Sequence, residues 1–336
     1  GYNSLLTGVW ANKHNVWDNY EKGIDSINYN YWNIFRLFKA QYPGKKTAVY
    51  STWLDNRTKL VGSAAKAAGN LMPDIYYDGM ELDTVQFPHD ENGEFYRHID
   101  ESVIDHASAS IKKESPDLSW IYLEYTDEMG HRHGNSEQLT NAVKILDTQL
   151  KKLWDAITKR KKKFNEEWQV YITTDHGREE NGYHHGGQSE RERTTWIATN
   201  AKGLNDHFWK QQPAITDIMP SLARFLGIEI PKEKAMEIDG VPLTGKLSAV
   251  NPNAVLENGK LVVSWDVMDK KGMAEIWLST SNHFKTGGKD NYKMMKQVPV
   301  GEGKAVLDVK KGKAAFYKIV IETPNNLLNR WIIVKK

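Results

Sequence analysis

Thr173-Thr174-Asp175-His176-Gly177 stands at the end of the apolar run from Trp168 to Ile172. The run predicts a strand, so Asp175 and His176 are expected where that strand ends. Gly177 is expected to let the backbone turn there, because glycine adopts conformations that other residues rarely adopt. A carboxylate and an imidazole presented together at the edge of a sheet are suitable ligands for a divalent metal ion.

Further potential ligands come from two other segments of the chain. Tyr125 to His131 also follows an apolar run, and it places Asp127 and His131 four residues apart, close enough for both to reach one cation. Downstream, His184-His185-Gly186-Gly187 offers another imidazole. One carboxylate with two imidazoles, beside a second carboxylate with one imidazole, supplies the ligands of a zinc-type hydrolytic centre.

The order of these segments resembles the alkaline phosphatase superfamily, and most closely its nucleotide pyrophosphatase/phosphodiesterase branch. The resemblance covers residues 1 to 245 and rests on Asp127-x-x-x-His131, then Asp175-His176-Gly177, then a His directly before Gly-Gly. It implies an α/β fold with a mostly parallel sheet flanked by helices. It also implies two divalent metal ions, expected to be zinc. One ion would be held by Asp127, His131 and His185, and the other by Asp175, His176 and an upstream Asp.

Several neighbouring histidines are set apart from this ligand set. The family's late ligand directly precedes the small-residue turn, which selects His185 rather than His184. His133 lies two residues beyond His131 and by alternation should point away, so we interpret it as structural. His14 matches a family position outside the metal ligands and is not included in the site.

The start of the chain bears on the nucleophile. Ser4-Leu5-Leu6-Thr7-Gly8 resembles a family segment that follows a strand with a metal-binding Asp and a Thr or Ser nucleophile. By that resemblance the nucleophile lies shortly before Gly1, outside this chain, and the second metal site is incomplete here. Gly1 falls where the phosphodiesterases carry an Asn that helps to hold the phosphoryl oxygen, which leaves the substrate subgroup open. Ser4 and Thr7 are interpreted as structural rather than as replacement nucleophiles.

Helix and strand patterns alternate through the first part of the chain, which is typical of a parallel sheet with crossover helices. Helices are predicted at 31–41, 98–113 and 139–157, and strands at 46–51, 118–125, 168–172 and 194–199. Residues 215–228 resemble the helix that closes the domain in this superfamily. Residues 70–96 are expected to form an irregular connection or a cap. Short strands at 261–265, 274–278, 317–322 and 330–334 predict a β-sandwich similar to fibronectin type III domains. We therefore predict an N-terminally truncated metallohydrolase domain over residues 1–246 and a sandwich domain over 247–336.

Composition excludes some chemistries and partners. The chain has 40% hydrophobic and 26% charged residues, as in ordinary globular proteins, and its 0 cysteines exclude disulfides, thiolate ligands and a Cys nucleophile. No apolar run approaches the ~18 residues of a membrane-spanning helix, and no signal peptide is visible. Residues 251–336 are basic, but their lysines are scattered among strand-like stretches, which favours solvated strand faces over nucleic-acid binding.

The resemblance implies a metal-dependent phosphohydrolase of phosphodiesterase or nucleotide pyrophosphatase type. The resemblance implies a phosphate-ester small molecule or a nucleotide as substrate, and an extracytoplasmic location, either periplasmic or secreted. A sulfatase, phosphomonoesterase, phosphonate hydrolase or metal-dependent mutase remains open, because the shared metal ligands do not determine the leaving group. A non-catalytic binding protein, with a C-terminal domain that contacts a glycan or another protein, is the alternative from a different class.

Overall fold

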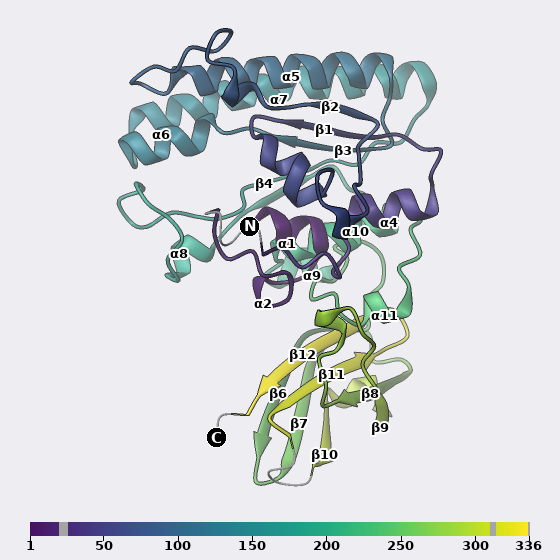
Figure 1. The fold of residues 1–336 in the computed structure, drawn as a ribbon. Coiled ribbons are helices and arrows are strands. Elements are labelled where there is room, and N and C mark those ends of the chain that lie inside the picture. Colours follow the sequence, from purple (N-terminus) through teal and green to yellow (C-terminus); the bar gives the residue numbers. More distant parts are fainter. Residues whose placement is uncertain (20–25, 310–313, 335–336) are drawn as a thin grey trace. The chain divides into compact units, whose positions relative to one another are not determined.

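The structure is a computed structural model that describes residues 1–19, 26–309 and 314–334 (Figure 1). By its contacts the chain divides into two compact units. The first, called the sheet unit, contains Phe35–Thr199 together with Asp18–Ile27. The second, called the terminal unit, contains Gly1–Trp17, Asn28–Ile34 and Asn200–Lys336. The domain boundary expected after residue 246 remains a prediction, since compact units defined by contacts need not coincide with sequence domains.

The sheet unit contains a parallel sheet of three strands in the order β2-β1-β3. These strands are β1 (Thr47–Ser51), β2 (Ile75–Tyr77) and β3 (Leu118–Tyr122). All five residues of β1 are buried, as expected for the central strand of a sheet covered by helices. A separate antiparallel pair is formed by β4 (Tyr171–Thr173) and β5 (Ile197–Thr199). The predicted α/β fold with a parallel sheet is therefore confirmed.

Helices α5 (Glu94–Lys113) and α7 (Glu137–Phe164) supply much of the core of this unit. The other helices are α4 (Ile34–Gln41), α6 (Tyr125–His133) and the short α8 (Glu190–Arg193). Helices α5 and α7 lie along the sheet (Figure 1). One hydrophobic cluster joins both helices to strand β1, and its members include Ala48, Tyr50, Ile99, Val103, Leu153 and Ala156.

Shorter helical turns complete the unit: a π-helix at Asn56–Val61 and 3₁₀ turns at Lys66–Ala68 and Met80–Leu82. Residues 70–96 contain more regular structure than the sequence predicted. They include strand β2 and the first turn of α5, which begins at Glu94. A strand of three residues is too short to show the alternation by which strands are recognised, and β2 forms by pairing with β1.

The terminal unit begins with two short helices, α1 (Tyr2–Thr7) and α2 (Ala11–His14). After residue 200 it adds α9 (Asp206–Lys210), a 3₁₀ turn at Ile215–Asp217, α10 (Ile218–Phe225) and α11 (Lys232–Ala235). Among the described residues, no helix of the chain is both long enough and apolar enough to cross a membrane.

Two antiparallel sheets follow, with strand orders β10-β7-β6 and β12-β11-β8-β9. Their strands are β6 (Ala249–Glu257), β7 (Lys260–Val267), β8 (Met273–Ser279), β9 (Lys293–Pro299), β10 (Lys304–Asp308), β11 (Phe316–Glu322) and β12 (Leu327–Ile333), with 3₁₀ turns at Phe284–Thr286 and Val300–Glu302. The sequence predicted β7, β8, β11 and β12, but not the other three strands. The likeness to a fibronectin type III domain remains a prediction.

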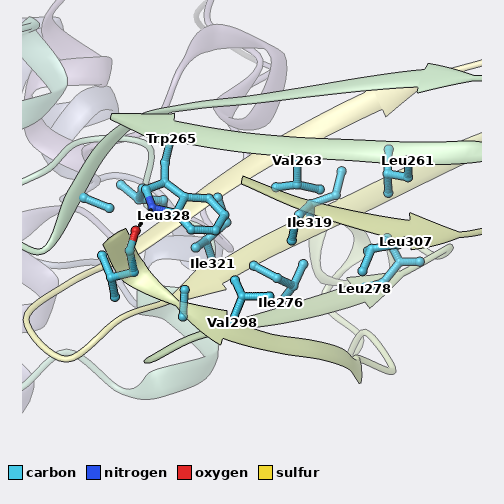
Figure 2. Packing of buried hydrophobic residues seen from close by; sticks show 14 of the residues in the cluster. Leu261, Val263, Trp265, Ile276, Leu278, Val298, Leu307, Ile319, Ile321 and Leu328 are labelled. Atoms are coloured by element: carbon cyan, nitrogen blue, oxygen red, sulfur yellow. Dashed lines mark hydrogen bonds between the residues drawn. The ribbon is translucent and has the colours of Figure 1, made fainter. Parts of the chain in front are cut away.

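Side chains from both sheets form one hydrophobic core (Figure 2). Buried and exposed residues alternate along β7, so that every second side chain points into this core. The core includes Leu261, Val263, Ile276, Leu278, Ile319 and Ile321. Trp265 is buried with them, and its indole Nε1–H donates to the carbonyl oxygen of Val300 at 3.0 Å, which satisfies its one polar group.

A buried ion cluster joins the short helices of the terminal unit to its strands. The side chain of Lys13, on α2, is 1% exposed, and its Nζ donates at 2.6 Å to each of three oxygens: Glu237 O, Asp239 Oδ1 and Asn329 Oδ1. Lys318, on β11, has a side chain that is 0% exposed. Its Nζ donates to Glu237 Oε1 at 2.5 Å and to Asp290 Oδ2 at 2.7 Å. Because buried charges are stable only when paired, this cluster requires helix and strands to fold together.

Candidate metal centre

Helix α6 presents Asp127 and His131 on one side. Residues four apart in an α-helix lie about one turn apart, and His131 Nε2 is 3.2 Å from Asp127 Oδ2. The strand predicted at 118–125 ends at Tyr122, and the two ligands lie on the helix that begins at Tyr125. The spacing of four residues between Asp127 and His131 is therefore about one helical turn. The apolar run before them favoured a strand instead.

The start of α6 is held by Asp100, a fully buried carboxylate on α5. Its oxygens accept from the backbone N–H groups of Glu124 at 3.0 Å and Tyr125 at 2.8 Å, and from the hydroxyl of Thr52 at 2.6 Å. The first N–H groups of a helix lack intrahelical partners, so Asp100 supplies a cap from another helix. Burial raises the pKa of Asp100 to about 6.

Strand β4 delivers Asp175 and His176 close to α6, as the sequence predicted. His176 Nε2 is 3.4 Å from Asp175 Oδ1 and 3.8 Å from Asp127 Oδ1. His176 Nδ1 lies 2.9 Å from the carbonyl oxygen of Gly177, which can only accept. The ring proton therefore resides on Nδ1, and the Nε2 lone pair faces the carboxylates, as in metal-binding histidines.

Gly177 is required for a different reason than the sequence suggested. Its φ is not among the positive values of the described glycines, so no left-handed turn occurs there. Instead, a Cβ at this position would lie 2.0 Å from Arg191 O and 2.7 Å from Thr194 O. The Gly177 N–H also donates to Glu192 O at 2.8 Å. The glycine allows the segment around α8 to approach the backbone of the Asp175-His176 pair.

His185 completes the cluster. Its Nε2 is 3.0 Å from His131 Nε2 and 3.9 Å from Asp127 Oδ2, and its ring stacks on His176 with centroids 3.6 Å apart. Burial, together with the neighbouring His176, lowers the pKa of His185 to about 4. The imidazole is therefore neutral near pH 7, which is the form that binds a metal ion.

The loop that carries His185 is anchored by Glu192. The Gly187 N–H donates to Glu192 Oε1 at 2.7 Å, and a Cβ on Gly187 would lie 2.5 Å from both carboxylate oxygens. Gly186 has a φ of +97°, a value that favours glycine. Of the two glycines after His185, Gly186 is thus explained by its positive φ and Gly187 by its close approach to Glu192.

The geometry fits a divalent metal ion. Asp127 Oδ2, His131 Nε2 and His185 Nε2 are separated by 3.2, 3.9 and 3.0 Å. Ligand atoms of a tetrahedral zinc ion lie about 3.3 Å from one another, given Zn–N and Zn–O distances of ~2.0–2.1 Å. Ligand atoms of Asp127, His176 and His185 also lie within 4.8 Å of one another. The structure thus brings all of the predicted ligand residues together, while their division between two ions remains a prediction.

The other histidines occupy different environments. His133 is two residues beyond His131 on a helix, where about 200° separates their directions. The alternation argued from the sequence therefore does not apply, although the expectation that it points elsewhere agrees with helical geometry. His184 has its ring 6.4 Å from that of His131. His14 is buried in the terminal unit, where its Nε2 is 2.9 Å from the Ser4 hydroxyl.

Sequence reasoning missed Arg178, which directly follows Gly177. Its Nη2 donates to the carbonyl oxygen of Asp127 at 2.6 Å and also contacts Asp127 Oδ1. Arg178 lines a cavity of about 570 Å³ together with Gly177, Glu190, Arg191 and Thr194. Its position beside the Asp-His-Gly sequence was the only local signal, and an arginine in a polar segment is by itself unremarkable as a sequence feature.

The parallel sheet flanked by helices, together with a cluster of carboxylates and imidazoles that could hold a metal ion, defines the class of an α/β protein with a candidate metal site. The chain belongs to the type I phosphodiesterase / nucleotide pyrophosphatase family, whose model matches residues 2–298. Members of this family are metal-dependent and act as hydrolases or phosphotransferases of the alkaline phosphatase superfamily.

Comparison with curated proteins finds 2,3-bisphosphoglycerate-independent phosphoglycerate mutases. Those of Mesoplasma florum and Mycoplasma mycoides subsp. mycoides are 28% and 29% identical over 132 and 136 residues, which are 39% and 40% of this chain. The chain spans about a quarter of the length of these mutases, since the match covers 24% of each.

Similar solved structures include an ectonucleotide pyrophosphatase / phosphodiesterase and a phosphoglycerate mutase. Murine ectonucleotide pyrophosphatase / phosphodiesterase 5 is 21% identical, with a TM-score of 0.33 and coverage of 52% of this chain and 44% of that chain. Leishmania mexicana phosphoglycerate mutase is 13% identical, with a TM-score of 0.39 and coverage of 62% and 38%.

Proposed function

We propose that this protein is a metal-dependent phosphohydrolase of phosphodiesterase or nucleotide pyrophosphatase type. The supporting observation is the convergence of carboxylates and imidazoles from α6, the end of β4 and the loop before α8 in a chain of this family. These residues are Asp127, His131, Asp175, His176 and His185.

We assign two divalent ions to the centre. Asp127, His131 and His185 would hold one, while Asp175 and His176 would hold the other together with an Asp from a segment before Gly1. Zinc suits this mixture of carboxylate and imidazole ligands without thiolates. When bound, such ions stabilise the charge that grows on the phosphoryl oxygens and lower the pKa of a hydroxyl nucleophile.

Contacts within the chain determine which nitrogen of His176 carries the proton and whether His185 is charged. His176 keeps its proton on Nδ1 because this N–H donates a hydrogen bond to the carbonyl oxygen of Gly177, so Nε2 is available as a ligand. His185 is neutral at pH 7 because its pKa is lowered to about 4, chiefly by burial. His185 therefore need not lose a proton before it binds a metal ion at neutral pH.

The nucleophile belongs to the part of the proposal that rests on the family resemblance. A Thr or Ser just before Gly1 would attack phosphorus and displace the leaving alcohol or phosphate, and water would then hydrolyse the covalent phospho-enzyme. Ser4 and Thr7 are poor substitutes, since both residues are buried, at 6% and 4% exposed, and the hydroxyl of Thr7 donates to Asn3 O at 2.5 Å.

Nucleotides are the first substrates to test, because inactive murine ectonucleotide pyrophosphatase / phosphodiesterase 5 was solved in complex with AMP. A metal-dependent mutase is the second candidate, favoured by the matches to two phosphoglycerate mutases. A sulfatase, phosphomonoesterase or phosphonate hydrolase would use the same ligands, and a binding protein would retain them without catalysis. An extracytoplasmic location, and contact of the C-terminal strands with a glycan or a protein, are proposed from the resemblance alone.

The test requires protein that includes the segment before Gly1. Zinc content is measured first, and hydrolysis of bis-p-nitrophenyl phosphate, mono-p-nitrophenyl phosphate and p-nitrophenyl sulfate is then compared with and without added zinc. AMP release from a dinucleotide and conversion of 3-phosphoglycerate are measured alongside. We expect zinc-dependent hydrolysis that is fastest on the diester or the dinucleotide. A zinc-loaded protein that is inactive on every substrate would overturn the hydrolase assignment and favour the binding protein.

A further inference from the structure

The guanidinium of Arg178 is held in one place by four acceptors in the sheet unit. Its Nη1 donates to the carbonyl oxygens of Tyr183 at 3.0 Å and Gly182 at 3.3 Å. Its Nη2 donates to the carbonyl oxygen of Asp127 at 2.6 Å and contacts Asp127 Oδ1. The side chain is only 13% exposed, so this arrangement is packed rather than a loose surface ion pair.

Gly130 provides the space that this guanidinium occupies. A Cβ built on Gly130 would lie 2.5 Å from both Cζ and Nε of Arg178, and 2.9 Å from its Nη2. Gly130 lies inside α6, where glycine is a poor helix former compared with alanine. A glycine at this place in a short helix is explained by the arginine that lies against it.

The contact with Arg178 separates the roles of the two Asp127 oxygens. Arg178 takes Oδ1, and Oδ2 faces His131 Nε2 at 3.2 Å and His185 Nε2 at 3.9 Å. A carboxylate that is free to rotate would sample many orientations, while one held at Oδ1 keeps Oδ2 directed at the two imidazoles. Partners of this kind, outside the metal ligands themselves, orient the ligands and tune metal affinity.

We propose that Arg178 is a positioning residue, which orients Asp127 for metal binding, and that residue 130 is glycine to admit the Arg178 guanidinium. This inference rests on the proposed metal centre but adds residues that the centre does not itself contain. Arg178 is itself a cation near a site for a divalent cation, so its charge and its positioning role predict opposite effects on metal affinity. Repulsion alone would weaken metal binding, whereas positioning strengthens it.

Zinc affinity of the full chain, measured by competition with a chelating dye at pH 7.5, decides between these two effects. We expect Arg178→Gln to weaken zinc binding about 10- to 100-fold, the usual effect of removing a residue that orients a ligand. Arg178→Lys keeps the charge but loses the planar fork, so a comparable loss is expected. Gly130→Ala should weaken binding as well, because its methyl group displaces the guanidinium.

The two residues act through one contact, so the double variant Gly130→Ala/Arg178→Gln should bind zinc no more weakly than Arg178→Gln alone. Arg191→Gln is the matched control: its guanidinium lines the same cavity but donates to Glu180 O and Asn135 Oδ1, away from the ligands. It should keep wild-type zinc affinity. Far-UV circular dichroism and thermal unfolding of each zinc-free variant show whether it is folded. If Arg178→Gln does not fold, the zinc affinity of Gly130→Ala tests the positioning role in its place.

The outcomes separate the two proposals. Unchanged or tighter zinc binding by folded Arg178→Gln, or additive losses in the double variant, would overturn the positioning role and leave the metal centre intact. A wild-type chain that binds no zinc would instead remove the metal centre itself.

Discussion

Replacing Gly177 by alanine tests whether the Asp-His-Gly sequence depends on close backbone packing. The added Cβ would lie 2.0 Å from Arg191 O and 2.7 Å from Thr194 O. An ordinary carbon–oxygen contact is about 3.3 Å, so the overlap with Arg191 O is about 1.3 Å. Both neighbours are backbone atoms, which do not move aside as the end of a flexible side chain does.

The expected cost combines two effects. Forcing a methyl group into a packed site destabilises by about 1–3 kcal/mol. Separating the segments also weakens the hydrogen bond from Gly177 N–H to Glu192 O, now 2.8 Å, which contributes about 1 kcal/mol. We therefore expect Gly177→Ala to lower the free energy of unfolding by about 2–4 kcal/mol. Zinc affinity should fall with it, because Asp175 and His176 directly precede the displaced residue.

Gly44→Ala is the matched control. Gly44 belongs to the same unit, its Cβ would meet nothing within 4 Å, and no positive φ is recorded for it. Urea unfolding followed by tryptophan fluorescence gives the free energies, and dye competition gives the zinc affinity. If Gly177→Ala unfolds within about 0.5 kcal/mol of Gly44→Ala and binds zinc equally well, the close-packing explanation is wrong.

Three further sets of variants test the ligand set, the ion cluster and the cap of α6. Asp127→Ala and His131→Ala should each lower the zinc content measured by mass spectrometry while His133→Ala should not, and equal losses in all three would reject the choice of ligands. Lys318→Met leaves the buried carboxylates of Glu237 and Asp290 without that cation, so we expect a loss of about 3–5 kcal/mol in urea unfolding, against little change for the exposed Lys296→Met. Asp100 has a folded pKa of about 6 against an ordinary 3.8, so its neutral form stabilises the fold below pH 3.8 and this contribution is lost as the pH rises through 6. The unfolding free energy of wild type relative to Asp100→Asn should thus fall by about 2 kcal/mol between about pH 4 and 6.5, and a constant difference would contradict the raised pKa.

Local pattern was sufficient to predict several elements. Helices α5 and α7 repeat apolar residues at helical spacing, and strands β1 and β3 are short apolar runs bounded by polar turns. Each pattern is set by which face of the element is buried, so it is visible without knowledge of the rest of the chain. Strand β2 has only three residues and gave no such pattern.

The conformation of the segment from Tyr125 to His133 needed tertiary information. The apolar run before it favoured a strand that continues, but the strand ends at Tyr122 and a helix begins at Tyr125. The helix is capped by Asp100, which is 25 residues away from Tyr125 in the sequence. A cap supplied by another helix leaves no signature beside the helix that it begins, so the sequence could not reveal it.

By itself, the sequence determined the chemical identities of the candidate ligands, their order along the chain, and the α/β character of the part that carries them. It did so because ligand chemistry belongs to residue types and strand or helix patterns belong to short segments. Only the tertiary structure decided that Arg178 lies over Gly130 and holds Asp127, that Glu192 anchors the loop of His185, and that Gly177 is needed for packing rather than for a turn. These are contacts between segments that are distant along the chain, and folding alone brings their atoms within bonding distance.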